Sequence, residues 1–76
     1  MTTLNNLPIG STGKVISLVS LDKDRRRMLD LGFILGTKVK ALFRSPLGDP
    51  TAYLVKNSVI ALSEEDAKNI LVKTHE

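Results

Sequence analysis

The stretch MLDLGFILGTKV, residues 28–39, decides how the chain passes from a helix into a strand. Nine of its twelve residues are apolar or glycine, and Gly32 and Gly36 lie four positions apart. Glycine often ends a helix in the left-handed conformation, and it also permits a tight turn before a strand. We therefore predict that Gly32 ends a short helix and that Gly36 turns the chain into the next strand. Phe33 and Ile34 are predicted to enter the core.

Two functional interpretations of this stretch are disfavoured by its length and spacing. The glycines form a GxxxG pattern, which lets helices pack closely in membranes, but Asp30 and Lys38 bracket too few apolar residues for a spanning helix. A phosphate-binding loop needs a fixed glycine spacing followed by Lys and then Ser or Thr, and neither GSTGKV at residues 10–15 nor the GTK at residues 36–38 provides it.

The helix that ends at Gly32 is predicted to begin near Asp22 and Asp24. Carboxylates in a first turn interact favourably with the free amide groups and with the helix dipole. The apolar side of this helix is supplied by Met28, Leu29 and Leu31. The three arginines at residues 25–27 cannot all face one way at about 100° per residue, so at least one of them stays in solvent.

Residues 37–44 give the clearest strand pattern in the chain. Val39, Ala41 and Phe43 alternate with charged residues and are predicted to point inward, with Leu42 as the exception. Short β-branched and apolar runs predict further strands at residues 14–20, 51–55, 59–62 and 70–73.

Turn and cap residues connect these strands. Lys56, Asn57 and Ser58 are predicted to form a tight hairpin turn, and Ser63 is predicted to cap one or two helical turns. Leu4 and Leu7 are predicted to anchor the turn-rich entry segment. Five short strands within 76 residues predict an all-β fold with a closed or nearly closed small barrel, because closure removes exposed strand edges.

Composition limits the function more than it identifies it. We expect residues 1–76 to form a single domain with a formal net charge of +3, which is compatible with an anionic partner. The chain has no cysteine, and its single histidine is His75, so nucleophilic catalysis and nitrogen- or sulfur-ligated metal sites are disfavoured. No signal peptide or membrane span is recognisable, which predicts a cytoplasmic protein.

Arg25, Arg26 and Arg27 form the densest basic feature of the sequence. Phosphate contact is its natural functional interpretation, and a nucleic-acid-binding barrel that also uses Lys38 and Lys40 is an alternative that we keep. Aromatic residues that could stack on bases are scarce, which disfavours this alternative. Acidic residues 64–66 are best explained as charges that favour a helix N-terminus.

Four segments in register carry a resemblance to a known family. They are LPIGSTGKVISL (7–18), RRRMLDLGFILGTKV (25–39), SPLGDPTAYLV (45–55) and VIALSEEDAKNILV (59–72). Together they resemble the FeoA family, the ferrous iron transport protein A domain. The resemblance implies an SH3-like five-stranded small barrel with a short helix inserted after the first strand. It also implies an adaptor that supports FeoB, a membrane ferrous iron permease with a cytosolic G domain.

We therefore predict a non-enzymatic accessory protein of bacterial ferrous iron uptake that contacts a FeoB-type permease at the inner face of the cell membrane. No catalytic residue, resident cofactor, metal ligand or small-molecule substrate is assigned. A direct ferrous iron sensor is disfavoured by the missing cysteine, although carboxylates could bind iron weakly. The sequence does not determine the oligomeric state. The predicted partner-binding residues are Arg25, Arg26, Arg27, Met28, Leu42 and Leu47.

Overall fold

Strands dominate the computed structural model, which describes residues 1–75. In chain order, the elements are β1 (Thr2–Thr3), the 3-10 helix η1 (Leu4–Asn6), β2 (Thr12–Leu18), α1 (Asp22–Leu31), β3 (Lys38–Arg44), β4 (Thr51–Val55), β5 (Ser58–Leu62), α2 (Glu64–Ala67) and β6 (Ile70–His75). The five longer strands are those predicted from the sequence, and β1 is a two-residue addition. None of the helices in this part of the chain is long and apolar enough to cross a membrane.

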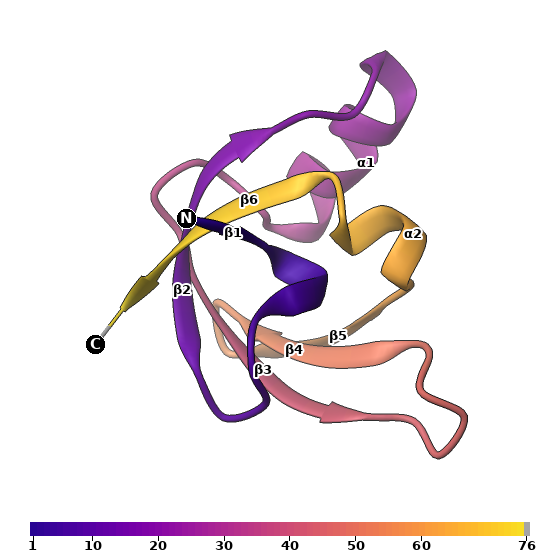
Figure 1. Ribbon diagram of the computed structural model, residues 1–76. Helices are drawn as coiled ribbons and strands as arrows, with labels where there is room; N and C mark the ends of the chain where they lie inside the picture. The colour runs from indigo at the N-terminus through magenta and orange to yellow at the C-terminus, as the bar shows by residue number, and fades with distance from the viewer. Residues whose placement is uncertain (76) are drawn as a thin grey trace.

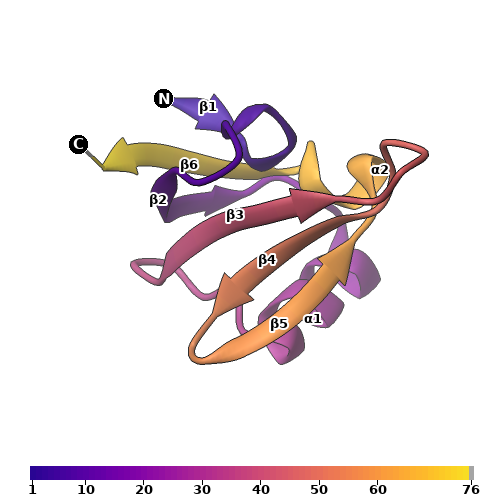
Figure 2. The ribbon, with the colours of Figure 1, turned by 90° about the horizontal axis from the view of Figure 1, so that it is seen from below.

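All strand pairs are antiparallel and form one sheet in the order β1-β6-β2-β3-β4-β5. The sheet curls around a central core, with α1 and α2 on one side (Figure 1). Seen from below, β3, β4 and β5 form one wall, and α1 lies behind β5 (Figure 2). The predicted all-β small barrel with a helix after its first long strand is therefore confirmed, with β1 and β5 at the two ends of the strand order.

The glycine turns predicted at the end of α1 are present. Gly32 has φ 109° and Gly36 has φ 89°, both in the left-handed region. The Phe33 amide donates to the Met28 carbonyl oxygen over 3.0 Å, which closes the helix end and directs Phe33 into the core at 0% exposure. The prediction for Ile34 was wrong: it is 41% exposed, because the chain turns there and the Thr37 amide donates to the Ile34 carbonyl oxygen.

The core is entirely apolar apart from the Tyr53 hydroxyl. Burial raises the pKa of Tyr53 above its usual value of 10.0, while the Thr51 side chain and Arg44 act in the opposite direction. Leu4 and Leu7 are buried, as predicted for the entry segment. The core residues are Leu4, Leu7, Val15, Leu18, Met28, Phe33, Val39, Ala41, Tyr53, Val55, Leu62, Ala67, Ile70 and Val72.

Three side-chain interactions hold the short helix α2 in place. The Ser63 side chain accepts a hydrogen bond from the Asp66 amide, which confirms the predicted cap. Asp49 in the β3–β4 loop accepts from the Glu64 amide over 2.9 Å. Arg27 of α1 pairs with Asp66 over 2.7 Å, so an ion pair joins the two helices.

Candidate partner-binding surface

The three predicted arginines have different environments on α1. Arg25 and Arg26 are exposed and line a shallow hollow of about 420 Å³ together with Asp22, Leu29 and Asp30. Arg27 instead donates to Asp66, which lies 39 residues further along the chain. Arg25 and Arg26 are therefore accessible to a partner, whereas Arg27 has a structural partner of its own.

Met28 is not a surface residue, and its prediction as a partner contact was wrong. Its side chain is 1% exposed and belongs to the core cluster. It is the one buried residue of α1, and it shares the core with side chains of the sheet. Leu42 is half-buried, and Leu47 is 94% exposed in the β3–β4 loop, as predicted for a solvent-exposed apolar side chain.

The predicted contact residues do not form one surface. Both views show the β3–β4 loop, which carries Leu47, well separated from α1, which carries Arg25 and Arg26 (Figures 1 and 2). The basic residues predicted to contact nucleic acid also lie on two separate surfaces. Lys38 and Lys40 line a different hollow from the one lined by Arg25 and Arg26.

The largest correction concerns Phe43, which was predicted to point inward and is 59% exposed. Ala41 pairs with Tyr53 and Phe43 pairs with Ala52, so the register between β3 and β4 shifts between Ala41 and Phe43. A β-bulge places one extra residue, here Leu42, in one strand and reverses the alternation beyond it. The break in alternation at Leu42 is the sequence signal that could have indicated the reversal.

The bulge creates an apolar patch on the outer face of β3, β4 and β5 that sequence reasoning missed. Phe43, Ala52 and Ala61 are cross-strand neighbours in one row, and Leu54 and Val59 are neighbours in the next row. Paired residues of an antiparallel sheet share a face. Phe43 is 59%, Leu54 36% and Val59 62% exposed. We call these three residues the outer apolar strip.

The strip ends on β5, which is an edge strand of the sheet. Within residues 1–75, β5 pairs with β4 and with no second strand. An edge strand presents free backbone amide and carbonyl groups to an incoming chain. The outer apolar strip therefore offers side-chain contacts directly beside a possible backbone pairing site on β5.

Candidate metal-binding clusters can be checked directly in the described part of the chain. Residues 1–75 contain no group of three or more His, Cys, Asp or Glu side chains placed to hold a metal ion. Two of the three acidic residues of α2 form ion pairs, since Asp66 pairs with Arg27 and Glu65 pairs with Lys68 over 2.9 Å.

Comparison with known proteins identifies the family. The FeoA domain model matches residues 2–74. The chain belongs to the FeoA family. This membership confirms the resemblance drawn from the four sequence segments, and it links the chain to ferrous iron transport.

Solved FeoA structures share this fold. A FeoA-like protein from Clostridium acetobutylicum is 36% identical, with a TM-score of 0.89, covering 96% of this chain and 85% of that chain. FeoA from Stenotrophomonas maltophilia, crystallised with zinc and described as a prokaryotic SH3 domain protein, is 31% identical with a TM-score of 0.84. The match covers 96% of this chain and 91% of that one, so the SH3-like architecture is confirmed.

A relative from Porphyromonas gingivalis is a fusion of Fe(2+) transport protein A with the Fe(2+) transporter FeoB. It is 29% identical over 70 residues, which cover 92% of this chain. This chain spans only 8% of the length of that curated relative. The FeoA family therefore includes a member that is joined covalently to a ferrous iron transporter.

Proposed function

We propose that this FeoA protein is a non-enzymatic accessory protein of bacterial ferrous iron uptake that acts by contact with a FeoB-type permease. The observation that carries this proposal is the Porphyromonas gingivalis relative, in which the two parts share one polypeptide. Fusion holds two modules at high effective concentration and so favours a contact between them. As separate molecules, the same two modules need an exposed surface for that contact.

The outer apolar strip is the surface that we assign to this contact. Interface energy is concentrated in a few large side chains near the centre of a patch, with aromatic residues enriched among them. Phe43 provides such an aromatic anchor, and Leu54 and Val59 extend the apolar area across two further strands. Among the residues predicted from the sequence, those that keep an exposed or half-exposed side chain remain proposed contacts: Arg25, Arg26, Arg27, Leu42 and Leu47.

The proposal includes the cytoplasmic face of the membrane as the place of contact. The FeoA resemblance implies a permease with a cytosolic G domain, and an adaptor of this kind would bind the permease from that side. No small-molecule substrate or resident cofactor is part of the proposed function.

The test is a titration of isotope-labelled protein with the cognate FeoB in neutral detergent, followed through backbone amide NMR signals. We expect shifts centred on β3, β4 and β5. Val59→Ser should weaken binding about fivefold or more, because truncation of an interface hot-spot side chain costs more than about 1 kcal/mol. Val19→Ser is the matched control, since Val19 is 60% exposed and Val59 is 62% exposed.

The outcomes separate the proposed surfaces. Shifts confined to α1 or to the Leu47 loop would move the contact to the residues predicted from the sequence and reject the strip. Equal affinity of the Val59→Ser and Val19→Ser variants would reject it as well. If FeoB produces no shifts at saturating concentration in any nucleotide state, the proposal of a direct contact is wrong.

A further inference from the structure

The outer face of the barrel carries a cluster of lysines that the proposed FeoB contact does not use. In the sheet register, Lys14 lies directly opposite Lys38 on β3 and directly opposite Lys73 on β6. Lys40 and Lys56 extend the same surface, because they line one groove with Lys38. We call Lys14, Lys38, Lys40, Lys56 and Lys73 the lysine face.

Repulsion between these lysines lowers the stability of the folded sheet. Like charges that lie directly opposite each other on neighbouring strands destabilise a sheet. In the described part of the chain, no ion pair within 4.0 Å involves any lysine of this face, and the two ion pairs present belong to Arg27 and Lys68. Within residues 1–75, the carboxylates are all on α1, α2 and the β3–β4 loop: Asp22, Asp24, Asp30, Asp49, Glu64, Glu65 and Asp66.

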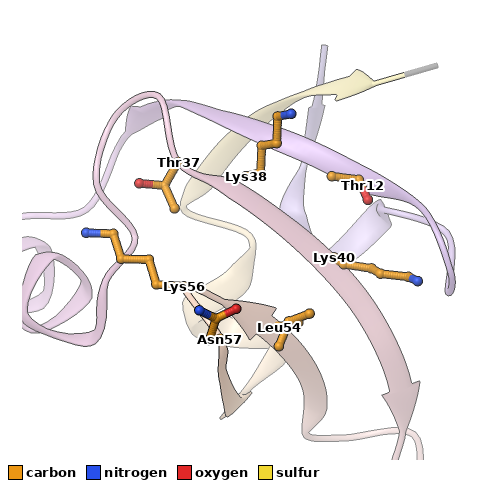
Figure 3. A pocket seen from close by; sticks show the side chains of 7 residues that line it. All are labelled: Thr12, Thr37, Lys38, Lys40, Leu54, Lys56 and Asn57. Carbon is orange, nitrogen blue, oxygen red and sulfur yellow. The ribbon is translucent and has the colours of Figure 1, made fainter.

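A groove of about 380 Å³ runs through this face between the lysines. Lys38, Lys40 and Lys56 line it together with Thr12 and Thr37, and their ammonium groups point outward in different directions (Figure 3). Primary amines and hydroxyls are donors suited to phosphate oxygens. No aromatic side chain lines the groove, so a platform for stacking nucleic acid bases is missing there.

Two exposed apolar side chains lie in the loop that leads into β3 and Lys38. Ile34 is 41% and Leu35 is 54% exposed in the loop between α1 and β3. This loop is held against β2 next to Lys14, because the Gly36 amide donates to the Val15 carbonyl over 2.7 Å and the Val15 amide donates to Thr37 over 2.9 Å. Lysines beside exposed leucine and isoleucine are the combination expected at a lipid interface, where charge contacts headgroups and apolar side chains enter the acyl boundary.

We infer that the lysine face binds the anionic lipid headgroups of a membrane surface, with Ile34 and Leu35 as its apolar contact. Juxtamembrane lysines gain free energy near an anionic leaflet, and the gain falls as ionic strength rises. The inference rests on the proposed function in one respect, namely that an accessory protein of a permease works beside a membrane. The outer apolar strip meets the lysine face at the Lys40–Leu54 pair, and Leu54 also lines the groove, so the two surfaces are neighbours on one face of the sheet.

The experiment is co-sedimentation with vesicles of phosphatidylglycerol and phosphatidylcholine, compared with vesicles of phosphatidylcholine alone, at low and at physiological salt. The test variant is Lys14→Glu, and the matched control is Lys23→Glu on α1, which changes the net charge equally. We expect Lys14→Glu to lose about tenfold in affinity for the anionic vesicles and Lys23→Glu to keep it within about twofold. The thermal midpoint of Lys14→Glu should not fall, because Glu at this position faces Lys38 and Lys73.

Several outcomes would overturn the inference. Equal losses in the two variants would mean that net charge alone drives binding, and equal binding to neutral vesicles would remove the role of the anionic headgroup. Tighter binding to mixed-sequence RNA than to vesicles at the same salt would assign the face to nucleic acid. Binding of FeoB in neutral detergent separates this inference from the proposed function: it should be unchanged in Lys14→Glu, and its failure in the parent protein would reject the permease contact without affecting the vesicle result.

Discussion

The two phenylalanines of this chain lie in regions that look alike in sequence and differ in the structure. Phe33 follows α1 and is 0% exposed, whereas Phe43 lies near the end of β3 and is 59% exposed. Each has an apolar residue beside it, Ile34 after Phe33 and Leu42 before Phe43, and both were predicted to be internal. The comparison shows that the position of an apolar side chain here depends on local backbone geometry more than on its hydrophobicity.

Each region owes its arrangement to one backbone feature. At Phe33, the left-handed Gly32 reverses the chain and the amide of Phe33 bonds to the end of the helix. At Phe43, the bulge at Leu42 turns the side chain from the inner to the outer face. One feature completes the core, and the other supplies the surface that we assign to partner binding.

The largest difference in stability is expected between truncation of Phe33 and truncation of Phe43. Phe33→Ala should lower the free energy of unfolding by about 3–5 kcal/mol, because it leaves a cavity in the core. Phe43→Ala should change it by about 0.5 kcal/mol or less, because the side chain is mostly in solvent. Urea unfolding followed by circular dichroism measures both. Similar losses for the two variants would show that Phe43 packs inward and that the register shift is absent.

A smaller effect of the same kind is expected for two residues that were both predicted as partner contacts. Met28→Ala should cost about 2–5 kcal/mol, since Met28 is 1% exposed in the core. Leu47→Ala, at a position that is 94% exposed, should stay within about 0.5 kcal/mol. Thermal and urea denaturation of the pair provide the measurement. A Met28→Ala variant as stable as the parent would falsify the assignment of Met28 to the core.

The smallest effect is expected at the ion pair that joins α1 to α2. Arg27→Ala should lower stability by no more than about 1 kcal/mol, because the two side chains are 54% and 22% exposed and solvent screens their attraction. Arg26→Ala is the control, and it should have no measurable effect. High salt should reduce the difference in the free energy of unfolding between the two variants, because it screens the ion pair. If the difference persists at high salt, Arg27 contributes through packing of its aliphatic stem instead.

Much of the candidate surface could not be predicted from the sequence, and the reason differs from residue to residue. The exposure of Leu47 followed from a loop rich in proline and glycine. The outer apolar strip did not follow, because the strict alternation assumed for β3 fails at a bulge. The lysine face joins β2, β3, β6 and the turn between β4 and β5, which are far apart in the chain, so only strand register brings Lys14, Lys38 and Lys73 together.

The sequence by itself determined the family, the order of the elements and the positions of the turns, because these depend on glycine, proline and capping residues acting over a few neighbours. Gly32, Gly36 and Ser63 have the roles that local backbone chemistry assigns to them. The tertiary structure alone decided that Phe43 faces solvent, that Met28 is buried and that Arg27 meets Asp66. The burial of Met28 and the Arg27–Asp66 pair depend on contacts between distant segments. The outward side chain of Phe43 depends on the register between β3 and β4, for which the break in alternation at Leu42 was the local signal.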